Sequence, residues 1–114
     1  MADIDLDKFR LRKFVEKLDD MGEVHHHDEP IDLSDLSSAY EISDKALLFK
    51  QAGPEKLELV ANVNGSRKRV AAALGVSEEE SLAEYQRRLA NPQPVVEIPN
   101  DEAPCRQVVL TGDD

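Results

Sequence analysis

Apolar residues recur at helical spacing in three stretches of the chain, and the first follows Asp7. Asp7 is placed to cap a helix that Gly22 ends, because glycine readily adopts the left-handed conformation found just past a helix C-terminus. The apolar positions between them share one face of that helix: Leu11, Phe14, Val15, Leu18 and Met21. The pattern therefore predicts an amphipathic helix at the start of the chain.

The other two predicted helices begin at serines. Ser66 is placed to cap a helix that runs through Leu74 and ends at Gly75. Residues 77–80, Ser-Glu-Glu-Glu, form a capping box that opens a third helix, which Pro92 stops. The apolar face of this third helix consists of Leu82, Tyr85 and Leu89.

Extended segments lie between and after these helices. Residues 23–30 read as a short extended piece, and residues 31–43 hold one helical turn around Leu33, Leu36 and Tyr40. The apolar runs 45–50 and 57–63 predict a strand pair joined by a loop at 51–56. A short strand at 95–96 within a proline-rich connector and a strand at 105–111 complete the prediction. The fold class is therefore α+β, a small mixed β-sheet packed with about three to four helices.

The chain is expected to form one domain, or part of a larger one, that spans residues 1–114. It closes in turn residues directly after the last predicted strand, which is typical of a cut inside a longer polypeptide. Its length also suits one domain or part of a larger one.

Charge and composition narrow the function. The 24 acidic and 14 basic side chains give a net charge of −10, which argues against nucleic acid or an anionic membrane as the main partner. Aromatic residues make up only 4% of the chain and Trp is absent, so stacking platforms for bases are not expected. Short apolar runs, an acidic start and a single cysteine favour a soluble, cytoplasmic protein.

A run of three histidines is the most conspicuous polar feature. In an extended segment His25 and His27 would share a face, with Asp28 and Glu29 adjacent, so a divalent metal could find two imidazoles and a carboxylate. Metal ligands usually come from separate elements, however, and His26 would point the other way. The favoured interpretation is an exposed polar strand or loop edge without a metal.

The segment from Asn64 to Arg69 is a second candidate. Backbone N–H groups at the start of a helix, together with Arg67, Lys68 and Arg69, could bind a phosphate or carboxylate. The alternative is an ordinary Ser66-capped helix whose cations pair with acidic residues of the same chain. Because the helix dipole opposes cations at this end, a compensating anion is expected.

Cys105, which follows Pro104, is the only thiol. A catalytic thiol needs a nearby base and a lowered pKa, and no spacing links Cys105 to the histidines. We expect a buried structural cysteine.

Five segments, taken in order, carry a family resemblance: residues 9–18 with 22–24, 28–32, 46–49, 65–75 and 105–114. Two of these segments are the most specific. In residues 65–75 the matching motifs are Gly-Ser-Arg, Arg-Val-Ala and Ala-Leu-Gly, and in residues 105–114 they are Cys105 and the closing Val-Leu-Thr-Gly-Asp-Asp. Over nearly its whole length the sequence resembles the amino-terminal region of UbiD-family decarboxylases.

The resemblance implies a reversible, non-oxidative decarboxylase of aromatic, heteroaromatic or α,β-unsaturated carboxylic acids. It implies prenylated FMN, Mn²⁺ and a monovalent cation as cofactors. The family's cofactor ligands and its Glu-Arg-Glu proton-transfer set lie beyond the segments that match here. No catalytic, cofactor-binding or metal-binding residue is therefore expected at any position of this chain, and residues 1–114 alone are expected to be inactive.

The expected role of the segment is structural, in support of the flavin-binding domain. The resemblance also implies a homo-oligomer and a flavin prenyltransferase that supplies the cofactor. The alternative is a free-standing acidic protein-interaction module without catalytic activity, which would use the helix start at Arg67, Lys68 and Arg69 as its contact surface.

Overall fold

A computed structural model describes residue 5 and residues 7–112 of the chain. Three strands and four α-helices follow one another in the order α1 (Leu11–Asp20), β1 (Val24–Ile31), α2 (Leu36–Tyr40), β2 (Ala46–Ala52), β3 (Leu57–Ala61), α3 (Arg67–Leu74) and α4 (Ser81–Ala90). Short 3₁₀ turns precede α1 and α2 and lie at 100–102 and 104–106. The α+β class and the small mixed sheet predicted from the sequence are confirmed.

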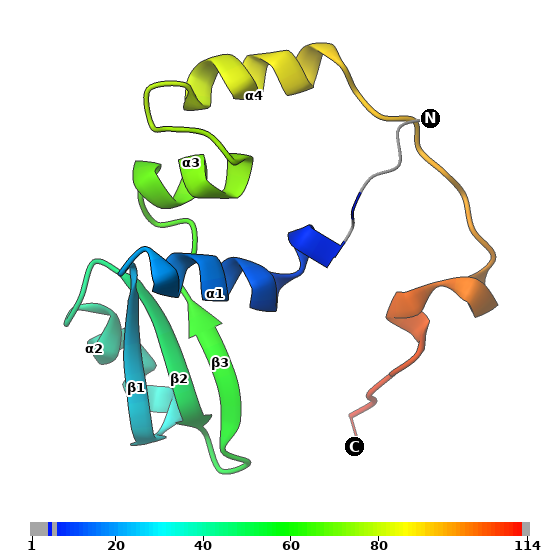
Figure 1. The fold of residues 1–114 in the computed structure, drawn as a ribbon. Helices are drawn as coiled ribbons and strands as arrows, with labels where there is room; N and C mark the ends of the chain where they lie inside the picture. The colour runs from blue at the N-terminus through cyan, green and yellow to red at the C-terminus, as the bar shows by residue number, and fades with distance from the viewer. Residues whose placement is uncertain (1–4, 6, 113–114) are drawn as a thin grey trace.

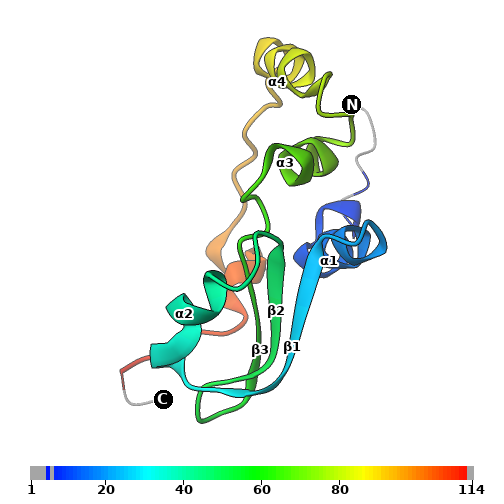
Figure 2. The ribbon, with the colours of Figure 1, turned by 90° about the vertical axis from the view of Figure 1, so that its left-hand side faces the viewer.

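The sheet is built around β2, with strand order β1-β2-β3. β1 runs parallel to β2, and the turn at residues 53–56 brings β3 back antiparallel to it. Helix α1 covers one face of the sheet and α2 covers the other, as Figure 2 shows. Helices α3 and α4 stack beyond α1, so that α4 lies at the end of the molecule farthest from the sheet (Figure 1).

Alternating side chains of β2 divide the core into two clusters. The cluster under α1 consists of Leu18, Val24, Ala46, Leu48 and Ala72, with four partly buried residues around it. The cluster under α2 consists of Ala39, Leu47, Phe49 and Ala52. Both faces of β2 are therefore buried, which explains why its sequence reads as a continuous apolar run.

The helix boundaries agree with the sequence signals except at two starts. Gly22 adopts a φ of 75° after α1, as expected for a helix-ending glycine. Asp7, however, does not cap α1: the cap position is Arg10, which makes no side-chain cap bond, and Asp7 instead forms an ion pair with Arg10 at 3.0 Å. A separate 3₁₀ turn at Asp7–Phe9 keeps the Asp7 carboxylate away from the first N–H groups of α1.

The capping box before α4 forms only in part. The Ser77 hydroxyl accepts a hydrogen bond from the Glu80 N–H at 3.4 Å, but residues 78–80 form a turn and the helix begins at Ser81. The Ser81 hydroxyl donates to the Glu78 carbonyl at 2.7 Å and so closes that turn before the helix starts.

The strands predicted at 95–96 and 105–111 are absent from the structure. Residues 92–99 have no regular structure, and Pro104 opens a 3₁₀ turn that runs to Arg106. A strand requires a hydrogen-bonded neighbour, and the sheet in the described part of the chain contains only β1, β2 and β3. The apolar pattern of these segments therefore does not by itself produce a strand.

The molecule is more extended than a compact domain of its length. Its radius of gyration is 17.5 Å, whereas a compact chain of this size would have a value of about 13 Å. The excess comes from α4, which lies beyond α3, and from the segment after it, which runs back along one side of the molecule apart from the sheet (Figure 1). None of the helices that the structure describes has the length and hydropathy required to cross a membrane.

Candidate functional site

The candidate site at the start of α3 is built on a tight turn at residues 62–65. Asn62 has a φ of 61°, and its side-chain amide donates to the Lys45 carbonyl at 3.4 Å, which ties the turn to the start of β2. A Cβ atom at Gly65 would lie 1.8 Å from the Asn62 Oδ1 atom, so a larger residue there would require the Asn62 side chain to move. Gly65 thus leaves room for the Asn62 side chain in the turn that leads into α3.

Both ends of α3 are closed by specific hydrogen bonds. The Ser66 Oγ atom accepts from the Arg69 N–H at 3.1 Å, which confirms the predicted cap. At the other end Gly75 adopts a φ of 77°, and Lys17 from α1 donates to the Ala72 carbonyl at 2.7 Å. A cation near the C-terminus of a helix interacts favourably with its dipole, so Lys17 helps to hold α3 against α1.

Glu23 is the anion that compensates the cations at the start of α3. Lys68 Nζ lies 2.9 Å from Glu23 Oε1, and Arg69 Nη1 lies 3.3 Å from Glu23 Oε2. The pKa of the Glu23 carboxyl lies below its ordinary value, chiefly because Lys68 donates a hydrogen bond to it, and Arg69 lowers it further. The compensating anion expected from the sequence is therefore present, and it engages two of the three cations.

Arg69 is almost completely buried, with only 1% of its surface exposed. Its Nη1 atom pairs with Glu23, but Nε and Nη2 have no hydrogen-bond partner among the described residues. Sequence reasoning placed Arg69 on the surface with its neighbours. The signal that could have corrected this is helical spacing, because Arg69 lies three residues before Ala72 and therefore shares its core-facing side.

Arg67 is the remaining cation, and its environment is different. Its side chain is exposed and makes no ion pair or hydrogen bond with any residue that the structure describes. It stands at one end of a groove of about 700 Å³ between α3 and α4, whose floor includes Val70, Leu74, Leu82 and Tyr85. Because Lys68 and Arg69 pair with Glu23, only Arg67 of the three cations is available to a binding partner. This weakens the alternative of a free-standing interaction module, which required all three as its contact surface.

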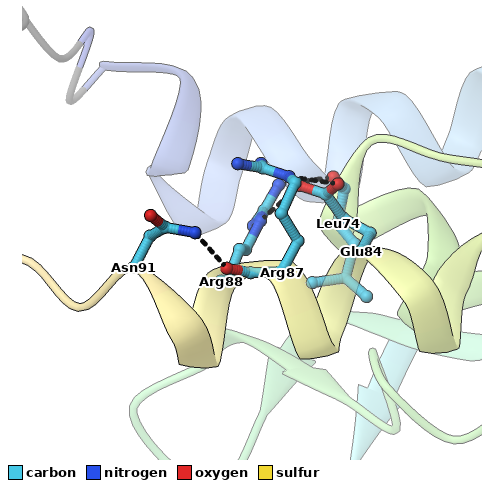
Figure 3. Close-up of polar contacts among 5 residues, drawn as sticks. All are labelled: Leu74, Glu84, Arg87, Arg88 and Asn91. Atoms are coloured by element: carbon cyan, nitrogen blue, oxygen red, sulfur yellow. Dashed lines mark hydrogen bonds and ion pairs between the residues drawn. The ribbon is translucent and has the colours of Figure 1, made fainter.

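The opposite wall of this groove is α4, which is held to α3 by a polar cluster. Arg88 donates through Nη2 to the Leu74 carbonyl at 2.7 Å and through Nε to Glu84 at 2.9 Å (Figure 3). Arg87 also donates to Glu84, and its carbonyl accepts from the Asn91 amide at 2.8 Å. Hydrogen bonds from Arg87 and then Arg88 lower the pKa of Glu84 from 4.5 to about 2.

The three histidines lie on β1 and point to both faces of the sheet. His26 lies on the α1 side, where its Nε2 atom is 2.8 Å from Asp19 Oδ1. His27 lies on the other side, with its ring centroid 5.5 Å from that of Phe49. The interpretation of this run as a polar strand is confirmed, since β1 is an edge strand of the sheet.

A second groove, of about 600 Å³, lies between α1 and the open part of the sheet. Most of its charged rim is paired: Glu58 accepts from Arg12 at 3.0 Å and from Lys50 at 3.2 Å, and His26 pairs with Asp19. Of the charged side chains that line the groove, Glu16 alone has no ion pair or hydrogen bond among the described residues.

Cys105 is exposed, so the expectation of a buried structural cysteine is wrong. It lies in the 3₁₀ turn that follows Pro104, where no layer of the fold covers it. The side chains around it, from residue 104 to residue 110, are exposed as well.

The described residues do not fit a divalent metal, because they contain no group of three or more His, Cys, Asp or Glu side chains that could hold one. The carboxyl groups with clearly shifted pKa values, those of Glu23, Glu58 and Glu84, are all shifted downward by neighbouring cations. A general acid near neutral pH needs a raised pKa instead. We therefore derive no catalytic step from this part of the chain.

Comparison with known protein families gives one match that covers most of the fold. The model of a family described as the 3-octaprenyl-4-hydroxybenzoate carboxy-lyase N-terminal domain, UbiD_N, matches residues 15–89. The matched region runs from within α1 to the last turn of α4, and so includes the whole sheet and both walls of the groove beside Arg67.

Proposed function

The chain belongs to the UbiD family, as an N-terminal region of its carboxy-lyases, and from this membership we propose that it is the amino-terminal structural domain of a larger enzyme. That enzyme would catalyse reversible, non-oxidative decarboxylation of an aromatic, heteroaromatic or α,β-unsaturated carboxylic acid. The observation that carries the proposal is the family match over residues 15–89, on a fold of the expected class.

The proposal assigns prenylated FMN, Mn²⁺ and a monovalent cation to the enzyme beyond residue 114. Prenylated FMN would supply the chemistry of decarboxylation when bound, and a flavin prenyltransferase would supply this cofactor. The role of residues 1–114 would be to support the flavin-binding domain in a cytoplasmic homo-oligomer.

The physical argument for a supporting role is the use that this chain makes of its apolar residues. A flavin site needs a concave, largely apolar pocket with convergent polar groups. The enclosed apolar side chains of this chain instead pack into the two clusters on either side of β2. Its shifted carboxyl groups are paired with cations rather than directed at an empty site.

The test compares the full-length enzyme with residues 1–114. The full-length enzyme, purified with prenylated FMN and Mn²⁺, should show flavin absorbance and release CO₂ from an aromatic or unsaturated acid. Residues 1–114 should retain no flavin and release no CO₂ under the same conditions. Flavin-dependent CO₂ release by residues 1–114 would refute the assignment of catalysis to the rest of the enzyme.

A further inference from the structure

Helix α4 is the element of the family fold with the least cover. None of its ten residues is buried, and its apolar stripe of Leu82, Tyr85 and Leu89 is more than half exposed at every position. An isolated helix of this length is marginal in water, since most helical stability in proteins comes from packing an apolar face. The stripe is therefore an apolar surface that the described part of the chain leaves largely uncovered.

The groove between α3 and α4 defines the chemistry of what covers it. Aliphatic and aromatic side chains of Val70, Leu74, Leu82 and Tyr85 supply its apolar lining, and Glu78 and Ser81 line it as well. An occupant that covers the apolar part must itself be apolar there. At one end stand Arg67 and the first turn of α3, where free N–H groups and the helix dipole add positive potential.

The cation at this end of the groove has no direct partner in the described part of the chain. Glu23 is shared by Lys68 and Arg69, whereas the Arg67 side chain has no partner among the described residues. A carboxylate on the occupant, placed at this end, would form an ion pair with Arg67 in the way that Glu23 does with Lys68 and Arg69.

We propose that the α3–α4 groove is the docking site for an apolar segment that carries a carboxylate and comes from the carboxy-lyase part of the same polypeptide. This inference rests on the proposed function. Both walls of the groove lie inside the matched region, which the family describes as an N-terminal domain of a carboxy-lyase. Further exposed apolar side chains follow α4 in the chain at Val95, Val96 and Ile98, outside the match.

Hydrogen exchange in the full-length enzyme tests whether the groove is covered. The α4 amides should be protected in the wild-type enzyme, and Leu82→Asp should raise their exchange rate about tenfold or more, because a charge replaces a covered leucine. Ala83→Asp is the matched control: it adds the same side chain one residue later, about 100° around the helix, at an exposed position that does not line the groove. Wild-type amides without protection, or equal effects of the two variants, would overturn the proposal.

Arg67→Glu tests the charged end of the groove. It should also raise the exchange rate of the α4 amides, whereas Lys13→Glu, which reverses an exposed cation on α1, should leave that rate unchanged. Equal exchange rates in Arg67→Glu and the wild type would remove the carboxylate from the proposal.

Photo-cross-linking from position 85 identifies the occupant. With benzoylphenylalanine in place of Tyr85, the expected product is a cross-linked peptide that joins α4 to a residue beyond 114 of the same polypeptide. A covalent dimer on a denaturing gel would show that a second copy fills the groove and would overturn the proposal. If the full-length enzyme releases CO₂ but its α4 amides are unprotected, the docking inference is wrong and the proposed function stands. If the cross-link forms within one polypeptide but the enzyme releases no CO₂, the proposed function is wrong and the docking inference stands.

Discussion

Residues 11–75 and residues 81–112 both carry aliphatic side chains at regular spacing, but only the first stretch buries them. In the first stretch, α1, the sheet, α2 and α3 enclose two clusters around β2. In the second stretch no side chain is buried, from Ser81 to Gly112. The difference lies in long-range neighbours rather than in composition, because an apolar pattern produces a core only where a second element lies against it.

The largest expected effect comes from removing a side chain at the centre of the first stretch. Phe49 is fully buried beneath α2, and Phe49→Ala should lower the free energy of unfolding by about 3–5 kcal/mol. Val96→Ala, in the second stretch, should change it by less than about 0.5 kcal/mol. Urea denaturation of the two variants measures both values, and a comparable loss from Val96→Ala would erase the distinction between the two stretches.

The buried cation of α3 should have the next largest effect. Arg69→Ala leaves Glu23 with only Lys68 and removes an almost completely buried side chain, at an expected cost of about 3 kcal/mol. Arg67→Ala, two residues earlier on the exposed side, should cost no more than about 0.5 kcal/mol. Thermal or urea unfolding distinguishes the two, and equal midpoints would mean that the burial of Arg69 contributes nothing.

Loss of the α3 cap should have a smaller effect. Ser66→Ala removes the acceptor of the Arg69 N–H and should destabilise the fold by about 1 kcal/mol. Ser66→Gly should cost only a few tenths of a kcal/mol, because glycine is tolerated at the cap position. An unfolding midpoint that Ser66→Ala leaves unchanged would mean that α3 begins at another residue.

The smallest effect, on α4, depends on pH. Because Arg87 and Arg88 lower the pKa of Glu84 to about 2 in the folded state, the ionised carboxylate stabilises α4 above pH 4.5. That stabilisation should be lost as the pH falls from 4.5 towards 2. The carboxyl carbon shift of Glu84, followed by NMR, should titrate in that range, and Glu84→Gln should abolish the acid dependence of α4 helicity. Titration of Glu84 at its ordinary pKa would show that the arginine cluster does not form in solution.

Local signals in the sequence were sufficient for most of the first stretch. The ends of α3 follow from Ser66 and Gly75, since a cap hydroxyl and a left-handed glycine act within a few residues of their position. The strand pair was also predicted, although β2 continues to Ala52 and β3 already ends at Ala61. These elements could be predicted because the forces that define them are close by in the chain.

The remaining features depend on neighbours that local patterns do not reveal. Residues 105–111 have strand-forming composition, but no partner strand lies beside them in the described part of the chain. Cys105 is exposed for the same reason. The burial of Arg69 depends on Glu23, which is 46 residues away along the chain, and only the folded arrangement brings the two together.

The two outer strands of the sheet bear on how the chain avoids aggregation. An open strand edge is a template for pairing with other chains. β1 interrupts its edge with a register irregularity between His27 and Pro30, with two carboxylates in between and a proline that cannot donate a hydrogen bond. β3 is only five residues long and carries Glu58 at its second position. The edge of β1 is thus protected by charge and proline, and the edge of β3 by its short length and its charge. Both features oppose the edge-to-edge pairing that begins fibril growth.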